Sequence, residues 1–202
     1  MMIDHGLSKD LTKTLGAIVI VFIILAAIYI VKTNREISNL KYQLEIINDD
    51  SGTKIPKELQ PLKNDIILYI KNKYPTIPDI LIRETAKQII IISMNEHISP
   101  ELLMGIIEVE SSFNPMAISS KNARGLMQVM PEWTKYFKLK TVCELHNVKT
   151  GILIGTKVFK IHLKEQDGDI QKALYCYVNK DKTYVDKIYN SVGRFIIFNK
   201  TH

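Results

Sequence analysis

The N-terminal part of the chain contains one long apolar segment. From Thr14 to Val31 there are 18 consecutive uncharged residues, most of them apolar. A helix of that length spans roughly 27 Å at 1.5 Å per residue, which is enough to cross a bilayer. A buried core helix would need a polar stripe on its solvent side, but apolar residues here occupy every face. The pattern therefore predicts a transmembrane helix over residues 14–31, after a short tail at 1–13.

A cleaved signal peptide has a similar pattern, with a short basic flank followed by an apolar run. In this chain Ala26 and Ala27 are followed by bulky apolar residues, so no small-residue cleavage site is evident. We therefore expect a retained signal anchor. Basic residues flank the segment on both sides, so charge alone does not set its orientation.

A short heptad pattern follows, and then a region of turn-forming residues. Apolar residues recur at spacings of three, four and three over residues 37–47, which predicts either a lone juxtamembrane helix or a stem for weak self-association. Residues 48–63 contain two prolines and no sustained apolar period, which is typical of a linker. We place the juxtamembrane helix and linker at 32–59 and a soluble domain at 60–202.

The domain shows a series of helical patterns and no run of alternating strand residues. The isoleucines at 89–92 resemble a strand, but the helix-forming residues before them favour a buried helix. Ser99 and Pro100 form a strong start signal, a capping hydroxyl followed by proline at the first helical position. The fold class is predicted to be mostly α, with helices over 79–96, 100–111, 131–137, 148–165, 169–177 and 183–191.

The composition is that of a globular protein, 46% hydrophobic and 24% charged, with a formal net charge of +6. The excess is concentrated in residues 121–202, which hold 15 basic and 7 acidic residues. Such a surface suits an anionic polymer or lipid, and the chain lacks the zinc-finger spacing and aromatic-basic signature of nucleic-acid binding. The five histidines are dispersed, so we expect no metal and no cofactor. Cys143 and Cys176 either pair or stay as thiols.

The chemistry is concentrated between Glu108 and Pro131. Glu110 ends an apolar helix and precedes Phe113, so its carboxyl is expected to be partly desolvated at the mouth of a cleft. Desolvation raises a carboxyl pKa, as a general acid near neutral pH requires. Glu108 lies roughly 200° away around the same helix and is expected to point elsewhere.

Two motifs lie in this region. The first is Glu110, Ser111, Phe113, Pro115 and Ala117; the second is Gly125, Leu126, Met127, Gln128, Met130 and Pro131. Together they resemble the soluble-type lytic transglycosylases, a family that cleaves the glycan strands of peptidoglycan. The resemblance covers about residues 80–192 and implies a goose-lysozyme-like α-helical fold. Weaker matches follow at Asn147, Gly151, Ala173, Leu174, Tyr177, Tyr184 and Val185.

The resemblance implies a role for each matching residue. Glu110 would protonate the glycosidic oxygen between N-acetylmuramic acid and N-acetylglucosamine. It would then deprotonate the muramoyl 6-hydroxyl, which closes onto C1 as a 1,6-anhydro sugar. No second carboxylate is needed, unlike in two-carboxylate glycosidases. Tyr177 would position the Glu110 carboxyl, while Ser111, Met127 and Gln128 would line the sugar subsites, with Met127 as an apolar wall.

One departure from the family pattern concerns glycan binding. Where the family has Tyr-Asn-Ala-Gly, this chain has Tyr177, Val178, Asn179 and Lys180, so Asn179 is the candidate substitute for the expected asparagine. A water-using muramidase and an inactive glycan-binding module of a wall-spanning apparatus remain as alternatives. Because peptidoglycan lies outside the cytoplasmic membrane, a single-pass protein is expected to hold its N-terminus inside and its domain outside. The basic residues expected to flank the cleft are Lys121, Arg124, Lys135, Lys138 and Lys140.

Overall fold

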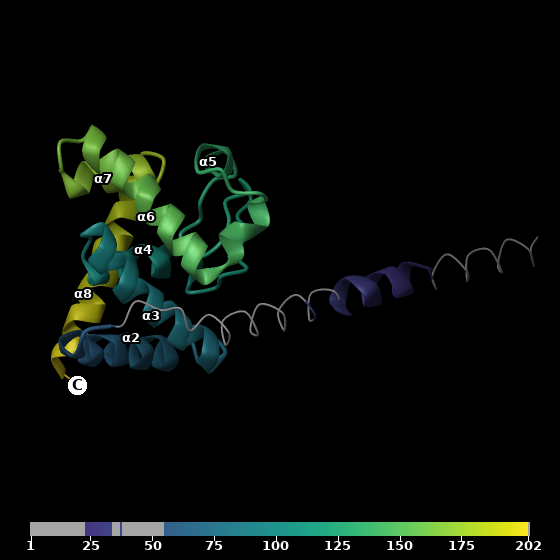
Figure 1. Cartoon of the computed structure of the whole chain (residues 1–202), viewed down its shortest axis with the longest axis horizontal. Coiled ribbons are helices and arrows are strands. Elements are labelled where there is room, and N and C mark those ends of the chain that lie inside the picture. Colours follow the sequence, from purple (N-terminus) through teal and green to yellow (C-terminus); the bar gives the residue numbers. More distant parts are fainter. Residues whose placement is uncertain (1–22, 34–36, 38–54, 202) are drawn as a thin grey trace, which may run out of the picture. The chain divides into compact units, whose positions relative to one another are not determined.

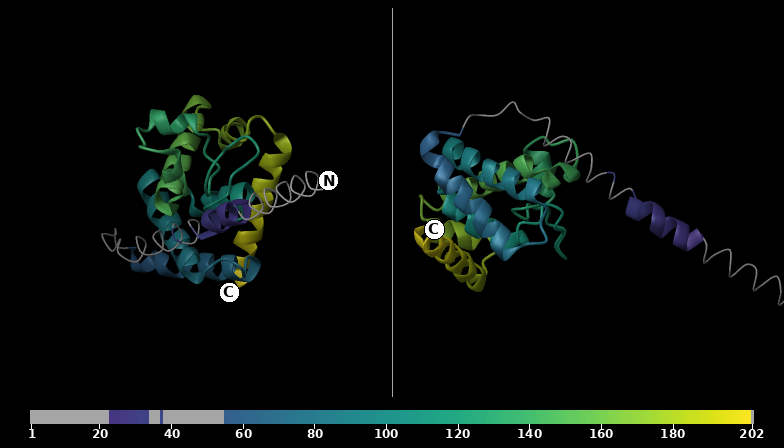
Figure 2. Two further views of the ribbon diagram at one scale, coloured as in Figure 1. Left: turned by 90° about the vertical axis from the view of Figure 1, so that its right-hand side faces the viewer. Right: turned by 90° about the horizontal axis from the view of Figure 1, so that it is seen from below.

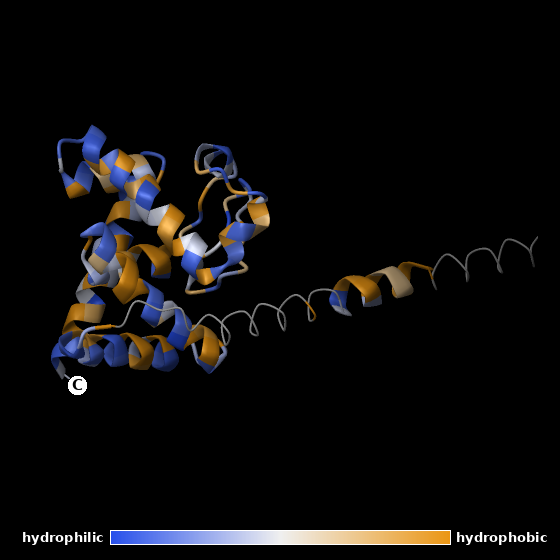
Figure 3. Ribbon diagram, viewed as in Figure 1, coloured by the Kyte–Doolittle hydropathy of each residue, from blue (hydrophilic) through white to orange (hydrophobic). Residues whose placement is uncertain are grey.

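The structure is a computed structural model that describes residues 23–33, 37 and 55–201. The chain divides into two units, residues 1–50 and 51–202. In the first unit, residues 23–33 form an exposed helix, and its apolar residues are coloured orange in Figure 3. None of the helices within these described ranges is long and apolar enough to span a membrane. Part of the expected anchor, 14–22, and most of the expected stem, 38–47, lie outside the described residues.

The second unit is built from helices, as expected from the sequence (Figure 1). Its described part contains no β-strand, only isolated bridges that join Arg124 to Ile118 and to Val129. The elements are η1 Lys57–Leu59, α2 Gln60–Lys73, α3 Asp79–Glu96, α4 Pro100–Ser111, α5 Glu132–Tyr136, η2 Val142–His146, α6 Val148–Glu165, α7 Ile170–Tyr177 and α8 Lys182–Thr201.

The linker prediction is wrong from Lys57 onward, where the chain becomes helical. Pro61 does not break this region, because it lies in the first turn of α2, where its missing N–H has no helical partner to lose. α2 contributes one apolar face to the core. Its buried residues lie three and four positions apart on that face: Ile66, Tyr69 and Ile70. α2 packs against both α3 and α8.

α4 is the central helix of the domain. Ser99 caps it, accepting a hydrogen bond from the Leu102 N–H at 3.2 Å. Residues 102–108 are all buried, as expected for a helix that is apolar on every side. Neighbouring helices cover it, chiefly α8 and to a lesser extent α3. A Cβ on Gly105 would clash with Val192, so glycine here permits the close approach of α4 and α8.

α8 is longer than predicted and runs along one side of the domain, in yellow in Figures 1 and 2. The predicted helix ended at Ser191, but α8 continues to Thr201. Buried residues keep their helical spacing through Val185, Ile188, Ser191 and Phe195. The ring of Phe195 meets that of Tyr69 edge to face, with centroids 5.3 Å apart. This contact with α2 explains why the C-terminal turns stay helical.

Candidate active site

Glu110 lies in the last turn of α4, immediately before a sharp change of chain direction. Ser112 and Phe113 adopt left-handed backbone conformations, with φ of 51° and 61°. The Phe113 side chain is only 1% exposed, and its burial stabilises the turn that ends the helix. The following loop therefore folds back beside Glu110 instead of continuing the helix.

Glu110 lines a cavity of about 620 Å³ formed by the end of α4, the loop after it, and the region between α7 and α8. The cavity brings together residues from both sequence motifs and from the downstream matches. Five of the six expected site residues line it; they are Glu110, Ser111, Gln128, Tyr177 and Asn179.

Burial controls the electrostatics of Glu110. Desolvation raises its pKa from 4.5 to about 7. No described residue donates a hydrogen bond to this carboxyl or forms an ion pair with it, so nothing offsets the cost of burying its charge. Glu110 therefore has the protonation behaviour expected of a general acid and base near neutral pH.

Tyr177 approaches Glu110 but is held by another group. Its hydroxyl donates a hydrogen bond of 2.7 Å to the main-chain carbonyl of Met127. Burial, together with the negative charge of Glu110, raises the pKa of Tyr177 well above its usual value. Tyr177 was expected to position the Glu110 carboxyl, but its hydroxyl donates to the carbonyl of Met127 in the second motif and not to Glu110. Tyr177 joins α7 to that motif.

Met127 does not form the apolar wall that was expected. Its side chain is 0% exposed, and it packs against Gly155 of α6, where a Cβ would clash with it. The Thr156 hydroxyl lies 3.7 Å from its sulfur. Met127 is a core residue beneath the cavity because α6 offers it a close-fitting apolar surface.

Ser111 and Gln128 join the two motifs through main-chain carbonyls. The Ser111 hydroxyl lies 2.8 Å from the Leu126 carbonyl and 3.0 Å from that of Ile107. The Gln128 amide nitrogen donates to the carbonyls of Gly125 at 2.9 Å and Ala117 at 3.3 Å. These bonds hold the loop in place, and they leave the Gln128 amide oxygen as the group it can offer to a sugar.

The sequence assigned no role to Tyr184 and Asp181, which also line the cavity. Tyr184 lies in α8, and both burial and the charge of Glu110 raise its pKa. Its only sequence signal was the weak Tyr-Val match. Val178 and Asn179 both line the cavity, and Asn179 has a φ of 56°. Of the basic residues expected to flank the cleft, only Lys121 lines it.

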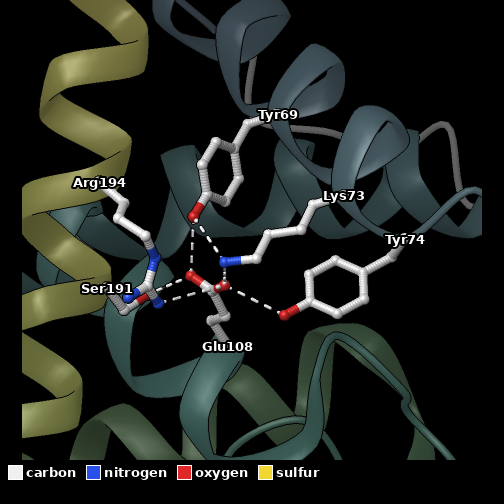
Figure 4. A network of polar contacts seen from close by, with 6 residues as sticks. All are labelled: Tyr69, Lys73, Tyr74, Glu108, Ser191 and Arg194. Carbon is white, nitrogen blue, oxygen red and sulfur yellow. Dashed lines mark hydrogen bonds and ion pairs between the residues drawn. The ribbon is translucent and has the colours of Figure 1, made fainter.

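Glu108 lies in a separate polar network, also at the end of α4 (Figure 4). Its carboxylate, 4% exposed, accepts hydrogen bonds from α2 and α8 and pairs with cations of both helices. Burial acts to raise its pKa, but the Lys73 ammonium and the Ser191 hydroxyl outweigh burial and lower it. The partners are Tyr69 at 3.0 Å, Tyr74 at 3.0 Å, Arg194 at 3.6 Å, Lys73 and Ser191. The expectation that Glu108 points away from the Glu110 site is confirmed, since it does not line that cavity.

Neither cysteine of the chain lines this cavity. Cys143 and Cys176 are both free thiols. Over the described ranges, no group of three His, Cys, Asp or Glu side chains is arranged to hold a metal ion. The charged residues that line the cavity are Glu110, Asp181 and Lys121, and the other polar groups in its lining are neutral.

The family model described as "Transglycosylase SLT domain" matches residues 87–192, just over half of the chain. The chain therefore belongs to the SLT transglycosylase family. The mostly helical, lysozyme-like SLT fold expected from the resemblance is confirmed.

Individual relatives match over shorter stretches. The membrane-bound lytic murein transglycosylase C of Actinobacillus pleuropneumoniae (serotype 5b, strain L20) is 65% identical over 34 residues, 17% of this chain and 9% of that protein. The protein of the same name from Mannheimia succiniciproducens is 56% identical over 45 residues, 21% of this chain and 13% of that protein. The matches thus span about a tenth of the length of these curated relatives.

A solved structure is also similar to this chain. It is a lytic transglycosylase Slt, an inactive mutant from Pseudomonas aeruginosa, with a TM-score of 0.49 and 17% sequence identity. The similarity covers 56% of this chain and 24% of that one.

Proposed function

We propose that this protein is a peptidoglycan lytic transglycosylase with Glu110 as its acid and base. The observation that carries the proposal is the carboxyl of Glu110, with its pKa raised to about 7 by burial, in an open cavity built from both SLT motifs. A general acid is most effective when its pKa lies near the working pH. The cavity of about 620 Å³ offers room for sugar rings.

The reaction would use Glu110 twice. The protonated carboxyl would donate its proton to the glycosidic oxygen as the C1–O bond of N-acetylmuramic acid breaks. The muramoyl 6-hydroxyl would then attack C1, and the carboxylate of Glu110 would take the hydroxyl proton. The products would be a free 4-hydroxyl on N-acetylglucosamine and a 1,6-anhydro end, with no water consumed. Glu110 returns to its protonated form, ready for the next strand.

The other cavity residues would hold the glycan and the acid. The Gln128 amide oxygen can accept from a sugar hydroxyl, and Asn179 supplies an amide where the family's asparagine is displaced by Val178. Ser111 and Tyr177 would act indirectly, since their hydroxyls bind main-chain carbonyls of the second motif. Their role would be to keep that motif at a fixed distance from the end of α4.

We also infer that the chain is anchored in the cytoplasmic membrane through residues 14–31. The uncharged run of 18 residues supports this inference, and two of the relatives are named as membrane-bound. A peptidoglycan substrate would require the N-terminus inside and the domain outside. Residues 37–47 would give at most a weak self-association, because their heptad pattern is short.

The test is to incubate the full chain with purified peptidoglycan and to identify the soluble products by mass spectrometry. We expect anhydromuramoyl products from wild type and at least about a thousandfold fewer from Glu110→Gln. Glu165→Gln is the matched control, because that acid is exposed on α6 and does not line the cavity. It should retain full activity.

Other outcomes would redirect the proposal. Products heavier by one water, with reducing ends, would make the protein a muramidase. If the folded wild type binds peptidoglycan but releases nothing, it is a glycan-binding module, and Val178 becomes the first residue to change.

A further inference from the structure

A second cavity, of about 300 Å³, adjoins the one that contains Glu110. Tyr184 lines both cavities, so they share a wall. The second cavity lies where α2, the end of α4 and α8 meet. Four of the six residues drawn in Figure 4 line it: Lys73, Tyr74, Glu108 and Arg194. Three cations line it: Lys73 from α2 and Lys187 and Arg194 from α8.

The positive charge of this second cavity exceeds its negative charge. Glu108 is the only acid that lines it, so the three cations leave an excess of two positive charges. Both Glu108 oxygens already accept hydrogen bonds: one from Lys73 and Tyr74, the other from Tyr69 and Ser191. With its side chain 4% exposed, Glu108 lies beneath the cations and leaves their outer donors to solvent.

Two of the cations retain capacity for a ligand. Arg194 has a side chain that is 51% exposed, and only one of its guanidinium nitrogens pairs with Glu108. Lys187 is exposed; its ammonium lies 5.0 Å from the centre of the Tyr184 ring and forms no ion pair within the described part of the chain. Asn190, also exposed, adds an amide to the lining. This combination of cations and neutral hydrogen-bonding groups suits a carboxylate attached to a peptide.

We propose that the second cavity binds a carboxylate of the peptide side chains that peptidoglycan strands carry. This inference rests on the proposed function, since the same strand would place its sugars beside Glu110. Tyr184 would then lie between the sugar and its peptide, with Lys187 stacked on its ring. The site selects peptide-bearing strands over bare glycan through a charge interaction that lies outside the bond-breaking site.

Binding and cleavage are measured separately so that the two proposals can fail independently. For binding, the full-length Glu110→Gln protein in neutral detergent is titrated calorimetrically with the free peptide released from peptidoglycan by an amidase. A second titration uses the same peptide with its carboxylates converted to carboxamides. We expect the carboxamide form to bind at least tenfold more weakly.

The matched variants are Lys187→Glu, Asn190→Asp and the control Lys164→Glu. Lys187 and Asn190 line the second cavity, while Lys164 is exposed on α6 and lines neither cavity. The first two variants should weaken binding of the charged peptide at least tenfold, and the control should not change it. With Glu110 restored, Lys187→Glu should raise KM for peptide-bearing glycan at least fivefold relative to its KM for amidase-stripped glycan.

Several results would overturn the inference: no peptide binding, equal binding of the carboxamide form, equal weakening by Lys164→Glu, or inorganic phosphate binding as tightly as the peptide. Charged-peptide binding with no glycan cleavage by wild type would instead retain the site and reject the proposed reaction.

Discussion

Two carboxyl groups on the last turns of α4 have opposite pKa shifts. Glu110 is partly buried without a hydrogen-bond donor or a cation, and its pKa rises to about 7. Glu108, two residues earlier, is also buried, but donors and cations surround it and lower its pKa. The comparison shows that burial alone does not determine the charge of an acid. The groups that neighbouring helices bring to it decide whether it stays ionised.

The two acids also differ in their contribution to the stability of the fold. The Glu108 network ties α2, α4 and α8 together through one carboxylate. Glu110 makes no such connection, and its ionised form is destabilised by burial. Glu108 therefore stabilises the packing of three helices, while Glu110 has the raised pKa that the proposed reaction needs.

Removing Glu108 should have the largest effect on stability. Glu108→Ala leaves Lys73 without its counter-charge and the buried Ser191 hydroxyl without its acceptor, so we expect the free energy of unfolding to fall by about 4 kcal/mol. Urea denaturation at pH 7 measures it, with Glu165→Ala as the control. Because the folded-state pKa of Glu108 is lowered, its contribution should be lost as the pH falls through that pKa. A loss below about 1 kcal/mol would contradict the structural role.

Replacing Glu110 should raise the free energy of unfolding above pH 5, whereas replacing Glu108 lowers it. Its folded-state pKa of about 7 lies above the unfolded value of 4.5, so wild type loses stability as the pH rises between these values. Glu110→Gln does not ionise, and its stability relative to wild type should increase by about 2 kcal/mol from pH 5 to pH 8. Urea denaturation at the two pH values measures this. A difference that is independent of pH would show that Glu110 does not titrate in this range.

The pH dependence of kcat/KM for cleavage should depend on Glu110 and not on Glu108. The proposed reaction begins with protonated Glu110, so kcat/KM should fall about tenfold per pH unit above a pKa near 7. Glu108→Gln should keep the same break in the profile, because Glu108 is paired and does not line the cavity that contains Glu110. Initial rates on soluble glycan strands between pH 5 and 9 provide the test. A shifted break in Glu108→Gln would mean that the two sites are coupled.

The smallest effects should come from one tyrosine hydroxyl at each site. Tyr74→Phe removes a hydrogen bond to Glu108, and Tyr177→Phe removes one to the Met127 carbonyl. Each should cost about 1 kcal/mol of stability. Only Tyr177→Phe should also lower kcat, by about tenfold, because it holds the second motif beside the acid. Equal loss of kcat in both variants would remove this distinction.

Local patterns predicted much of this molecule. α3, α4 and α6 begin and end as expected, since their apolar spacing and start signals such as Ser99 act within a few residues. α2 was missed because Pro61 and its short apolar face resemble a linker. α8 was predicted too short, because its last turns are stabilised by Phe195 against Tyr69, a contact that no local pattern encodes.

For the candidate site as well, the sequence predicted some features and missed others. The SLT motifs alone identified Glu110, Ser111, Gln128, Tyr177 and Asn179, and the structure gathers all five around one cavity. The partners of these side chains were not predictable. The hydroxyl of Tyr177 binds a carbonyl 50 positions earlier in the chain, and Met127 is drawn into the core by α6.

The sequence by itself determined most of the helices and the family, and it singled out Glu110 as the candidate acid, because each of these depends on residues close together along the chain. Only the tertiary structure decided which acid is charged. Ser191 lies 83 positions from Glu108, and Lys73 lies 35 positions from it. Packing of α2 and α8 against α4 brings these donors to Glu108 and withholds them from Glu110. The solvation and pairing of a carboxylate depend on such distant neighbours, and these set its pKa.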